Sequence, residues 1–419
     1  MSLLPLDAAR KLPKPGKFSD PVMFSPDRID FLRNAIATNT LPPKLKTKWT
    51  GIVAMPDTWT VKGAYNPWNI PENYSDDSAT NQEMLANVHA DTMAAAKYAF
   101  RYVVNGDPAD AARVVAIVNQ FSAIQTFMTN AGSTLNWFDA WPVLIQAMIM
   151  IKGSAAATTT VVNNFKAVLA RALNTLEPIA YTRDNNWAAW GLAMEFAAAI
   201  YLGNRARFDR AVDRWYYIFD DTIISNFLVT NGGPANGQRK NNVAHREITR
   251  MGGGHGNGAY GLLYTAFHLD GMTVAAEWAR IGGVWLYDHV APDGSSLKGL
   301  WEEVAYMKRY GAPNLSTDYL KVQWYNTSNK ETDPSYKYWY AGYYTNRVGA
   351  GFYICQELWP LTTAYELMNG FNRVAIAPGF YPPTPEGAAG GWTSGYGIVQ
   401  DYYGMYGADL AYWGRPLAG

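Results

Sequence analysis

The hydrophobic positions between about residue 80 and residue 292 recur with the period of an α-helix. Apolar side chains return every three or four residues over segments of roughly 15–22 residues, and each segment ends at Gly, Asn, Asp or Pro. Few segments in this region alternate with period two, and β-branched runs are short, so the pattern predicts an all-α core. Helices joined by short loops pack antiparallel. We therefore expect helical hairpins arranged as an α/α toroid or incomplete α/α barrel, with inner helix ends that line a groove.

Several helix ends carry explicit signals. Ser25 before Pro26, and Asp107 before Pro108, each place a capping side chain ahead of a first-turn proline. Loops at Gly153 and Gly203 are expected to close two later helices, because glycine readily adopts the left-handed conformation found after a helix C-terminus.

Three stretches differ from this helical pattern. Residues 41–79 are rich in Pro, Trp, Asn and Tyr and read as a long ordered loop, while residues 326–348 and 376–419 are dense in Tyr, Trp and Gly. The latter two are interpreted either as lids over a groove or as a wrap that seals the toroid. With no internal repeat and no sharp shift in composition, we expect one domain over residues 1–419, with an N-terminal wrap (1–79), a helical core carrying the site (80–292), and C-terminal helices and aromatic loops (293–419).

Composition narrows the class of protein. With 48% hydrophobic and 17% charged residues, the chain has the composition of a folded globular protein. Lys+Arg and Asp+Glu both number 35, so no global field draws it to nucleic acid or to an anionic membrane. The single Cys355 gives no disulfide or metal-thiolate spacing, and we expect no metal and no cofactor. Aromatic residues reach 14%, which suits sugar-binding platforms as well as a core.

The first candidate for chemistry is a pair of amides followed by two tryptophans: Asn185, Asn186, Trp187 and Trp190 open a helix that is expected to run to about Leu202. A buried unpaired amide costs about 1–3 kcal/mol, so two adjacent amides at a helix start indicate a polar ligand. The alternative is an ordinary N-cap followed by core tryptophans.

The second candidate is the glycine-rich segment between Gln238 and Gly261. Basic groups concentrate here within an otherwise neutral chain, which suits an anionic sugar, and Tyr260 begins the next helix. The glycines let the backbone approach a ligand closely. The segment lacks the GxxxxGK(S/T) motif of a phosphate-binding loop and the strand that precedes it. The alternative interpretation of this segment is a flexible solvated loop. The polar residues of this segment are Arg239, Lys240, His245, Arg246, Arg250 and His255.

The remaining histidines are weaker candidates. His89 and His268 lie within helical patterns and are expected to be core residues, and His289 lies near a helix end, where a cation suits the helix dipole.

Together the two candidate segments resemble the alginate lyase superfamily, which is related to chondroitin, hyaluronan and heparinase-type lyases built on α/α toroids. The resemblance rests on the Asn-Asn-Trp-x-x-Trp helix start, on Glu247-x-x-Arg250, and on Tyr260, and it covers roughly residues 20–290. It implies that Asn186 neutralises the carboxylate of a uronic acid, that Arg250 assists, and that Tyr260 is the catalytic acid and a candidate base.

The chain departs from that family pattern at two places. Trp187 stands where the family has histidine, and the interval from Arg250 to Tyr260 is longer. His245 or His255 is therefore a candidate to supply the imidazole, and the base stays open between Tyr260, His255 and His245. The expected substrate-binding residues are Asn185, Trp187, Trp190, Arg239, Lys240 and Arg246.

The chemistry implied is β-elimination from an anionic polysaccharide, which would be the protein's partner. Two other classes stay open. One is an α/α-barrel glycoside hydrolase, which needs paired carboxylates such as Asp184 with Glu247 or Glu302. The other is a noncatalytic glycan-binding or virion protein. No window of about 18 apolar residues occurs, so the sequence predicts no membrane span. The start of the chain lacks the pattern of a secretory signal. An extracellular, periplasmic or virion-associated location stays open. The sequence does not predict an oligomeric state.

Overall fold

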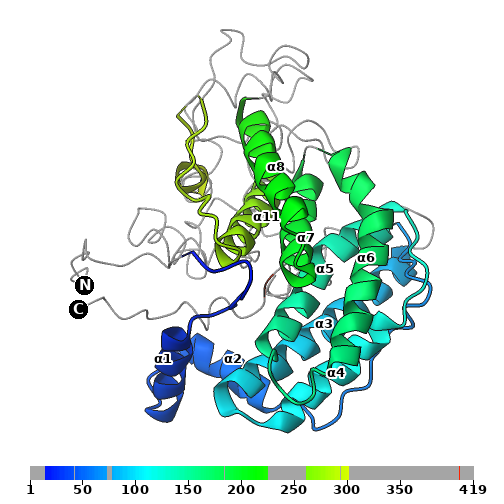
Figure 1. The fold of residues 1–419 in the computed structure, drawn as a ribbon, viewed down its shortest axis with the longest axis vertical. Helices are drawn as coiled ribbons and strands as arrows, with labels where there is room; N and C mark the ends of the chain where they lie inside the picture. The colour runs from blue at the N-terminus through cyan, green and yellow to red at the C-terminus, as the bar shows by residue number, and fades with distance from the viewer. Residues whose placement is uncertain are drawn as a thin grey trace, which may run out of the picture.

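A computed structural model describes residues 15–41, 43–72, 78–183, 185–224, 261–292 and 294–301, together with Met405 (Figure 1). Within these ranges every regular element is a helix, and β-pairing is limited to isolated bridges at Trp68–Phe127 and Val290–Ser296. None of the described helices has both the length and the apolar character needed to cross a membrane.

The described helices follow one another with short connections, except across residues 54–77 and 225–260. They are α1 (Pro26–Ala37), α2 (Pro43–Val53), α3 (Ser78–Asn105), α4 (Pro108–Ser122), α5 (Ala131–Met150), α6 (Thr159–Tyr181), α7 (Asn186–Leu202), α8 (Arg205–Ile224) and α11 (Gly261–Ile281).

Seven of the described helices, α3 to α8 and α11, form two layers, and the sequence explains which helix lies in which layer. Helices α5 and α7 are apolar around their whole circumference, and nearly all their residues are buried. Helix α6 instead carries one apolar stripe, with polar residues on its other face. Helices α3, α5, α7 and α11 pack on one another in succession as the inner layer, and α4, α6 and α8 cover them from outside (Figure 1).

The inner helices run in the same direction. Short connections make α4 antiparallel to α3 and α5, and α6 antiparallel to α5 and α7, so α3, α5 and α7 are parallel. Two close approaches fix α11 against α7. A β-carbon built on Gly271 would lie 2.9 Å from Ala189 Cβ. One built on Gly282, the residue after α11, would lie 3.3 Å from Ile200 Cδ1 of α7 and closer still to Phe208 Cε2 of α8. Gly282 follows Gly271 by the same number of residues as Ile200 follows Ala189, so α11 runs parallel to α7.

Gly271 allows this close packing, and we expect Gly271→Ala to lower the free energy of unfolding by about 1–3 kcal/mol, as overpacked cores do. The added methyl would also lie 3.1 Å from the backbone nitrogen of Trp190, an atom that cannot move aside like a flexible side chain. Urea unfolding would measure the change. The matched control is Gly51→Ala in α2, where no atom lies within 4 Å of the added methyl, so helix propensity should raise stability by about 0.5–1 kcal/mol. Equal effects of the two substitutions would contradict the assigned packing.

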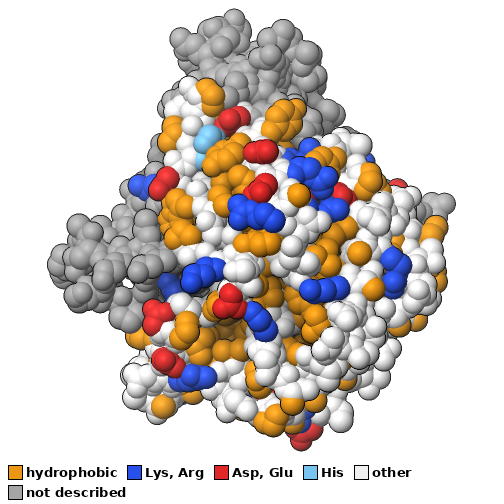
Figure 2. Space-filling view, in the orientation of Figure 1, with side chains coloured by type: hydrophobic (Ala, Val, Ile, Leu, Met, Phe, Trp, Pro, Cys, Tyr) orange, Lys and Arg blue, Asp and Glu red, His pale blue; other side chains and the backbone are white. Residues whose placement is uncertain are grey.

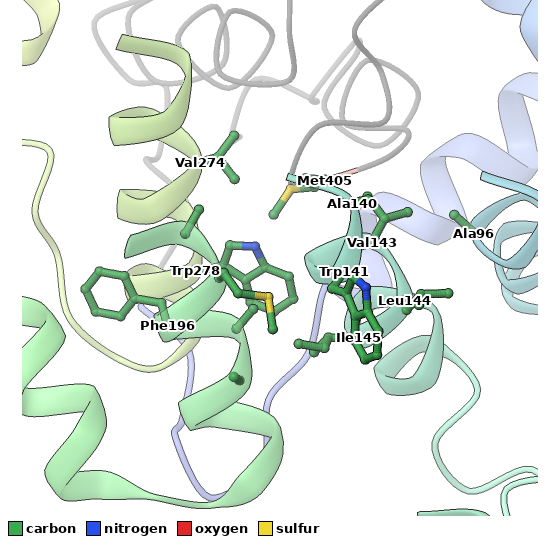
Figure 3. Close-up of a cluster of buried hydrophobic side chains, with 14 of the residues drawn as sticks. Ala96, Ala140, Trp141, Val143, Leu144, Ile145, Phe196, Val274, Trp278 and Met405 are labelled. Carbon is green, nitrogen blue, oxygen red and sulfur yellow. The ribbon is translucent and has the colours of Figure 1, made fainter. Parts of the chain in front are cut away.

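Large buried side chains fill the space between the inner helices. Trp141 of α5, Phe196 of α7 and Trp278 of α11 belong to one cluster of buried side chains and are all 0% exposed (Figure 3). Met405 belongs to the same core and has no exposed surface, although it comes from the aromatic-rich C-terminal stretch. At this residue the stretch contributes to the core.

The helix boundaries agree with most of the sequence signals. Asp107 caps α4 by accepting a hydrogen bond from the Ala109 amide at 2.9 Å, and Gly203 ends α7 in the left-handed conformation with φ of 71°. Ser25 occupies the N-cap position of α1, although its side chain accepts no capping hydrogen bond.

The prediction of a continuous loop over residues 41–79 was wrong in part, because α2 occupies Pro43–Val53. Leu45, Trp49 and Ile52 are buried at helical spacing and give α2 an apolar stripe, which the Pro and Trp content of the region obscured. Beyond α2, residues 54–72 do follow an irregular path along the helices.

Candidate active site

The N-terminal ends of the inner helices lie at one end of the molecule, because these helices are parallel. A helix N-terminus presents unpaired backbone amides and a partial positive charge, so several such ends together suit an anionic ligand. Asn186 is the first residue of α7, and Gly261, which follows Tyr260 in the sequence, is the first residue of α11.

The start of α7 is organised by the amide pair predicted from the sequence. Asn185 is the N-cap: its Oδ1 accepts a hydrogen bond from the Trp187 amide at 3.1 Å. Asn186 follows in the first helical turn and is only 7% exposed. The N-cap alternative for Asn185 is therefore confirmed, whereas Asn186 is a buried residue of the first helical turn.

The two tryptophans after the amides have different surroundings. Trp187 is half-buried, and the exposed guanidinium of Arg183 lies 5.0 Å from its ring centroid. Trp190 is 3% exposed and belongs to the hydrophobic core. Burial favours the core alternative for Trp190 over direct contact with a substrate, while Trp187 remains accessible at the end where α7 begins.

Helix α11 extends past the start of α7. Gly271 lies level with Ala189, so α11 begins about 10 Å further out along the helix axis, at 1.5 Å for each residue. Asn186 is therefore recessed behind the start of α11. The other predicted site residues fall outside the described residues, and they are Arg239, Lys240, His245, Arg246, Arg250, His255 and Tyr260; Asp184, Glu247 and Glu302, the carboxylates of the hydrolase alternative, also fall outside.

The irregular segment that contains Ile70 and Pro71 crosses the same end of the molecule, where it contacts the first turns of α3 and α5. Asn81 Nδ2 donates to the Pro71 carbonyl at 2.5 Å, and the Ile70 amide donates to Ser133 Oγ at 2.8 Å. Asn130 caps α5 through its Oδ1, which accepts from the Ser133 amide at 2.8 Å. These contacts fix the rim beside the recessed start of α7.

A cluster of charged residues connects the outer face of α7 to α6 and α8, and no motif in the sequence predicted it. Tyr181, the last residue of α6, donates its hydroxyl to Glu195 of α7 at 2.7 Å, and Arg210 of α8 donates to the same carboxylate at 2.7 Å. Arg207 and Arg210 also pair with Glu177 of α6. Figure 2 shows basic and acidic side chains interspersed over this face. Arginines three residues apart on an outer helix look like an ordinary solvated face, so the sequence alone did not single them out.

Burial raises the pKa of Glu195 to about 7, against the hydrogen bonds from Tyr181 and Arg210, which lower it. The folded state then binds this proton more tightly than the unfolded chain, whose value is near 4.5. This group's contribution to stability is therefore present at low pH and is lost as pH rises from about 4.5 to about 7.

We expect Glu195→Gln to remove that pH dependence. Between pH 4.5 and 7 the wild-type free energy of unfolding should fall with a slope of at most about 1.4 kcal/mol for each pH unit from this group, and the variant should lack that component. Urea unfolding at a series of pH values measures the slope. Glu83→Gln, an exposed position on α3, should keep the wild-type slope. An unchanged slope in Glu195→Gln would show that Glu195 does not titrate in this range.

The buried histidines behave as predicted from the sequence. His89 and His268 are 6% and 2% exposed, and His89 Nε2 lies 3.9 Å from Asp139 Oδ1. Burial raises the pKa of Asp139. In the part of the chain that the structure describes, no group of three or more His, Cys, Asp or Glu side chains could hold a metal ion.

Comparison with known proteins assigns this arrangement to a class. The fold resembles an alginate lyase from Bacteroides ovatus, with a TM-score of 0.55 and 14% identity over 85% of this chain and 97% of that one. It also resembles alginate lyase A1-III from Sphingomonas species A1, with a TM-score of 0.52 and 16% identity over 72% of this chain and 83% of that one. A tyrosine-to-phenylalanine variant of A1-III complexed with a tetrasaccharide gives the same score and identity, over 72% and 82% of the two chains. The fold is thus an all-α toroid, as predicted.

The molecule is a polysaccharide lyase. The family model for alginate lyase matches residues 53–312, more than half of the sequence, and the chain belongs to that family. No curated protein sequence matches the chain.

Proposed function

We propose that this lyase cleaves an alginate-like polymer of uronic acids by β-elimination. The observation that carries the proposal is the recessed amide of Asn186, which lies at the end of the toroid where α11 begins directly after Tyr260. Family membership, and the tetrasaccharides bound to similar lyases, support a substrate made of several linked sugars.

The reaction requires three tasks from the protein. A base removes the proton on C5 next to the carboxylate, the electrons form a C4–C5 double bond, and the C4–O bond breaks as the departing oxygen takes a proton. The intermediate charge is stabilised only if the carboxylate is neutralised. Preorganised donors of this kind are each worth about 2.7–4 kcal/mol.

The residues proposed for these tasks are those of the two candidate segments. Asn186 donates to the carboxylate and Arg250 adds a positive charge beside it. Tyr260 protonates the departing oxygen, a role that its ordinary pKa of about 10 allows. As a base, Tyr260 would need a nearby cation to favour the phenolate, and His245 and His255 are the alternative bases. The exposed guanidinium of Arg183 on Trp187 adds a further cation at the same end.

The test is a screen of polyuronides and bacterial capsules for unsaturated product. The proposal predicts that ultraviolet absorbance rises in step with new reducing ends on at least one uronate polymer. New reducing ends without the absorbance rise would instead indicate a hydrolase. Binding without cleavage of any polymer would indicate a glycan-binding protein.

A further inference from the structure

The turn between α6 and α7 is held from outside by one arginine of α8. Arg214 Nη2 donates to the carbonyl oxygens of Ala180 and Arg183, both at 3.1 Å. Its guanidinium also lies 4.0 Å from the ring centroid of Tyr181. A single side chain thus fixes the last turn of α6 and the first part of the connection to α7.

Tyr181 links the same turn to α7 itself. The Tyr181 hydroxyl donates to both carboxylate oxygens of Glu195, at 2.9 and 2.7 Å. The guanidinium of Arg210, which also donates to Glu195, lies 5.0 Å from the centroid of the Tyr181 ring. The aromatic ring is therefore held between two guanidinium groups of α8 and a carboxylate of α7. The C-terminal end of α6 cannot move relative to α7 without breaking these contacts.

Arg214 differs from the other arginines on this face of α8. Arg207 and Arg210 form ion pairs with Glu177. Within the described residues Arg214 forms no ion pair, and it donates hydrogen bonds to two backbone carbonyls of the turn. Arg214 is half-buried, so its guanidinium is partly desolvated. Its hydrogen bonds to the two carbonyl oxygens offset part of that cost.

The residues held in this way lead directly into the candidate catalytic amide. Arg183 is followed by the N-cap Asn185 and by Asn186, so the position of the Arg183 carbonyl limits where α7 can begin. We infer that Arg214 is a positioning residue that sets the orientation of the Asn186 amide toward the substrate carboxylate. The inference rests on the proposed function of Asn186 and adds a residue about 30 positions along the chain, on another layer of the fold.

The test compares Arg214→Ala and Arg214→Lys with Arg205→Ala. Arg205 lies on the same helix, but its guanidinium pairs with the exposed Asp209 at 2.8 Å and lies over the rings of Phe18 and Phe208, so it is a matched control whose contacts differ from those of Arg214. Two quantities are measured in each variant: kcat and KM on the polyuronide that the wild-type enzyme cleaves, and hydrogen exchange of the Arg183 and Trp187 amides. Those amides are bonded to Ala180 O and Asn185 Oδ1 in the folded turn.

Arg214→Ala should lower kcat about 10- to 100-fold with KM within about threefold, because a small misplacement of a catalytic group has effects of this size. Exchange of both amides should accelerate at least about fivefold, since the open turn exposes them. Arg214→Lys should recover part of kcat, because an ammonium can still donate to the two carbonyls. Guanidinium added at low concentration should restore activity to Arg214→Ala and not to Asn186→Ala. Arg205→Ala should match the wild type in all of these measurements.

Three results would overturn the inference: wild-type kcat in Arg214→Ala, a fall in kcat with unchanged amide exchange, or an equal loss in Arg205→Ala. Failure of the proposed function looks different, because the wild-type enzyme would then give no unsaturated product from any polyuronide. In that case the inference fails with it. If the wild type is active, Asn186→Ala is inactive and Arg214→Ala is fully active, only the inference fails.

Discussion

Tyr260→Phe is expected to lower kcat by about 10²–10⁴ while KM for the polyuronide changes little. The phenol hydroxyl is the proposed proton donor to the departing oxygen, and general acid–base catalysis contributes an effect of this size. Tyr260→Phe removes only the hydroxyl and keeps the aromatic ring, so substrate should still bind. Initial rates of unsaturated product formation, with binding measured separately by calorimetry, would separate the two quantities.

The control for this prediction is Tyr217→Phe on α8, a tyrosine that is 63% exposed and has no proposed role. It should keep wild-type kcat. If Tyr260→Phe keeps both turnover and binding, Tyr260 is not the acid. If the wild-type protein binds polyuronides without turnover, the glycan-binding alternative replaces the lyase assignment.

Asn186→Ala is expected to lower kcat by about 10²–10³, which corresponds to about 2.7–4 kcal/mol of transition-state stabilisation. The amide is 7% exposed at the first residue of α7, and it is proposed to neutralise the carboxylate as charge develops on it. Asn186→Asp should be at least as damaging, because an anionic group of the same shape would repel the carboxylate.

Asn204→Ala provides the matched control for Asn186. Its Oδ1 accepts from the Arg207 amide at 3.0 Å at the start of α8, so it is an asparagine at a helix start on the outer layer. Its removal should lower the free energy of unfolding by about 1 kcal/mol and leave kcat within about twofold. If Asn186→Ala loses stability in the same way and keeps kcat, the amide is structural and the proposed carboxylate contact is wrong.

Local signals in the sequence predicted much of the fold. The capping residue Asp107 and the glycine Gly203 marked ends of α4 and α7, because caps and left-handed glycines act within a few residues of chain. The apolar character of α7 around its circumference explains its place in the inner layer. Helix α2 was missed, since its short apolar stripe is embedded in a Pro- and Trp-rich stretch and gains its stability from packing on the helices beside it.

The candidate site was predictable only in part, because its support is nonlocal. The amide pair at Asn185 and Asn186 stood out as costly residues at a helix start, and the structure separates their roles into cap and buried amide. The pairing of Arg214 with the α6–α7 turn could not be predicted, because it joins residues about 30 positions apart through backbone carbonyls that carry no sequence signature. The register of α11 on α7 likewise depends on Gly271 and Gly282 meeting particular residues of another helix.

The most direct test of the central claim is a crystal structure of Tyr260→Phe with a bound uronate tetrasaccharide, solved to a resolution that defines the sugar carboxylates. One uronate should have its carboxylate within about 3.2 Å of Asn186 Nδ2. The aromatic ring at position 260 should face C4 and C5 of that same sugar. A tetrasaccharide bound with every carboxylate away from Asn186, or with residue 260 facing a different sugar or the apolar interior, would contradict the central claim.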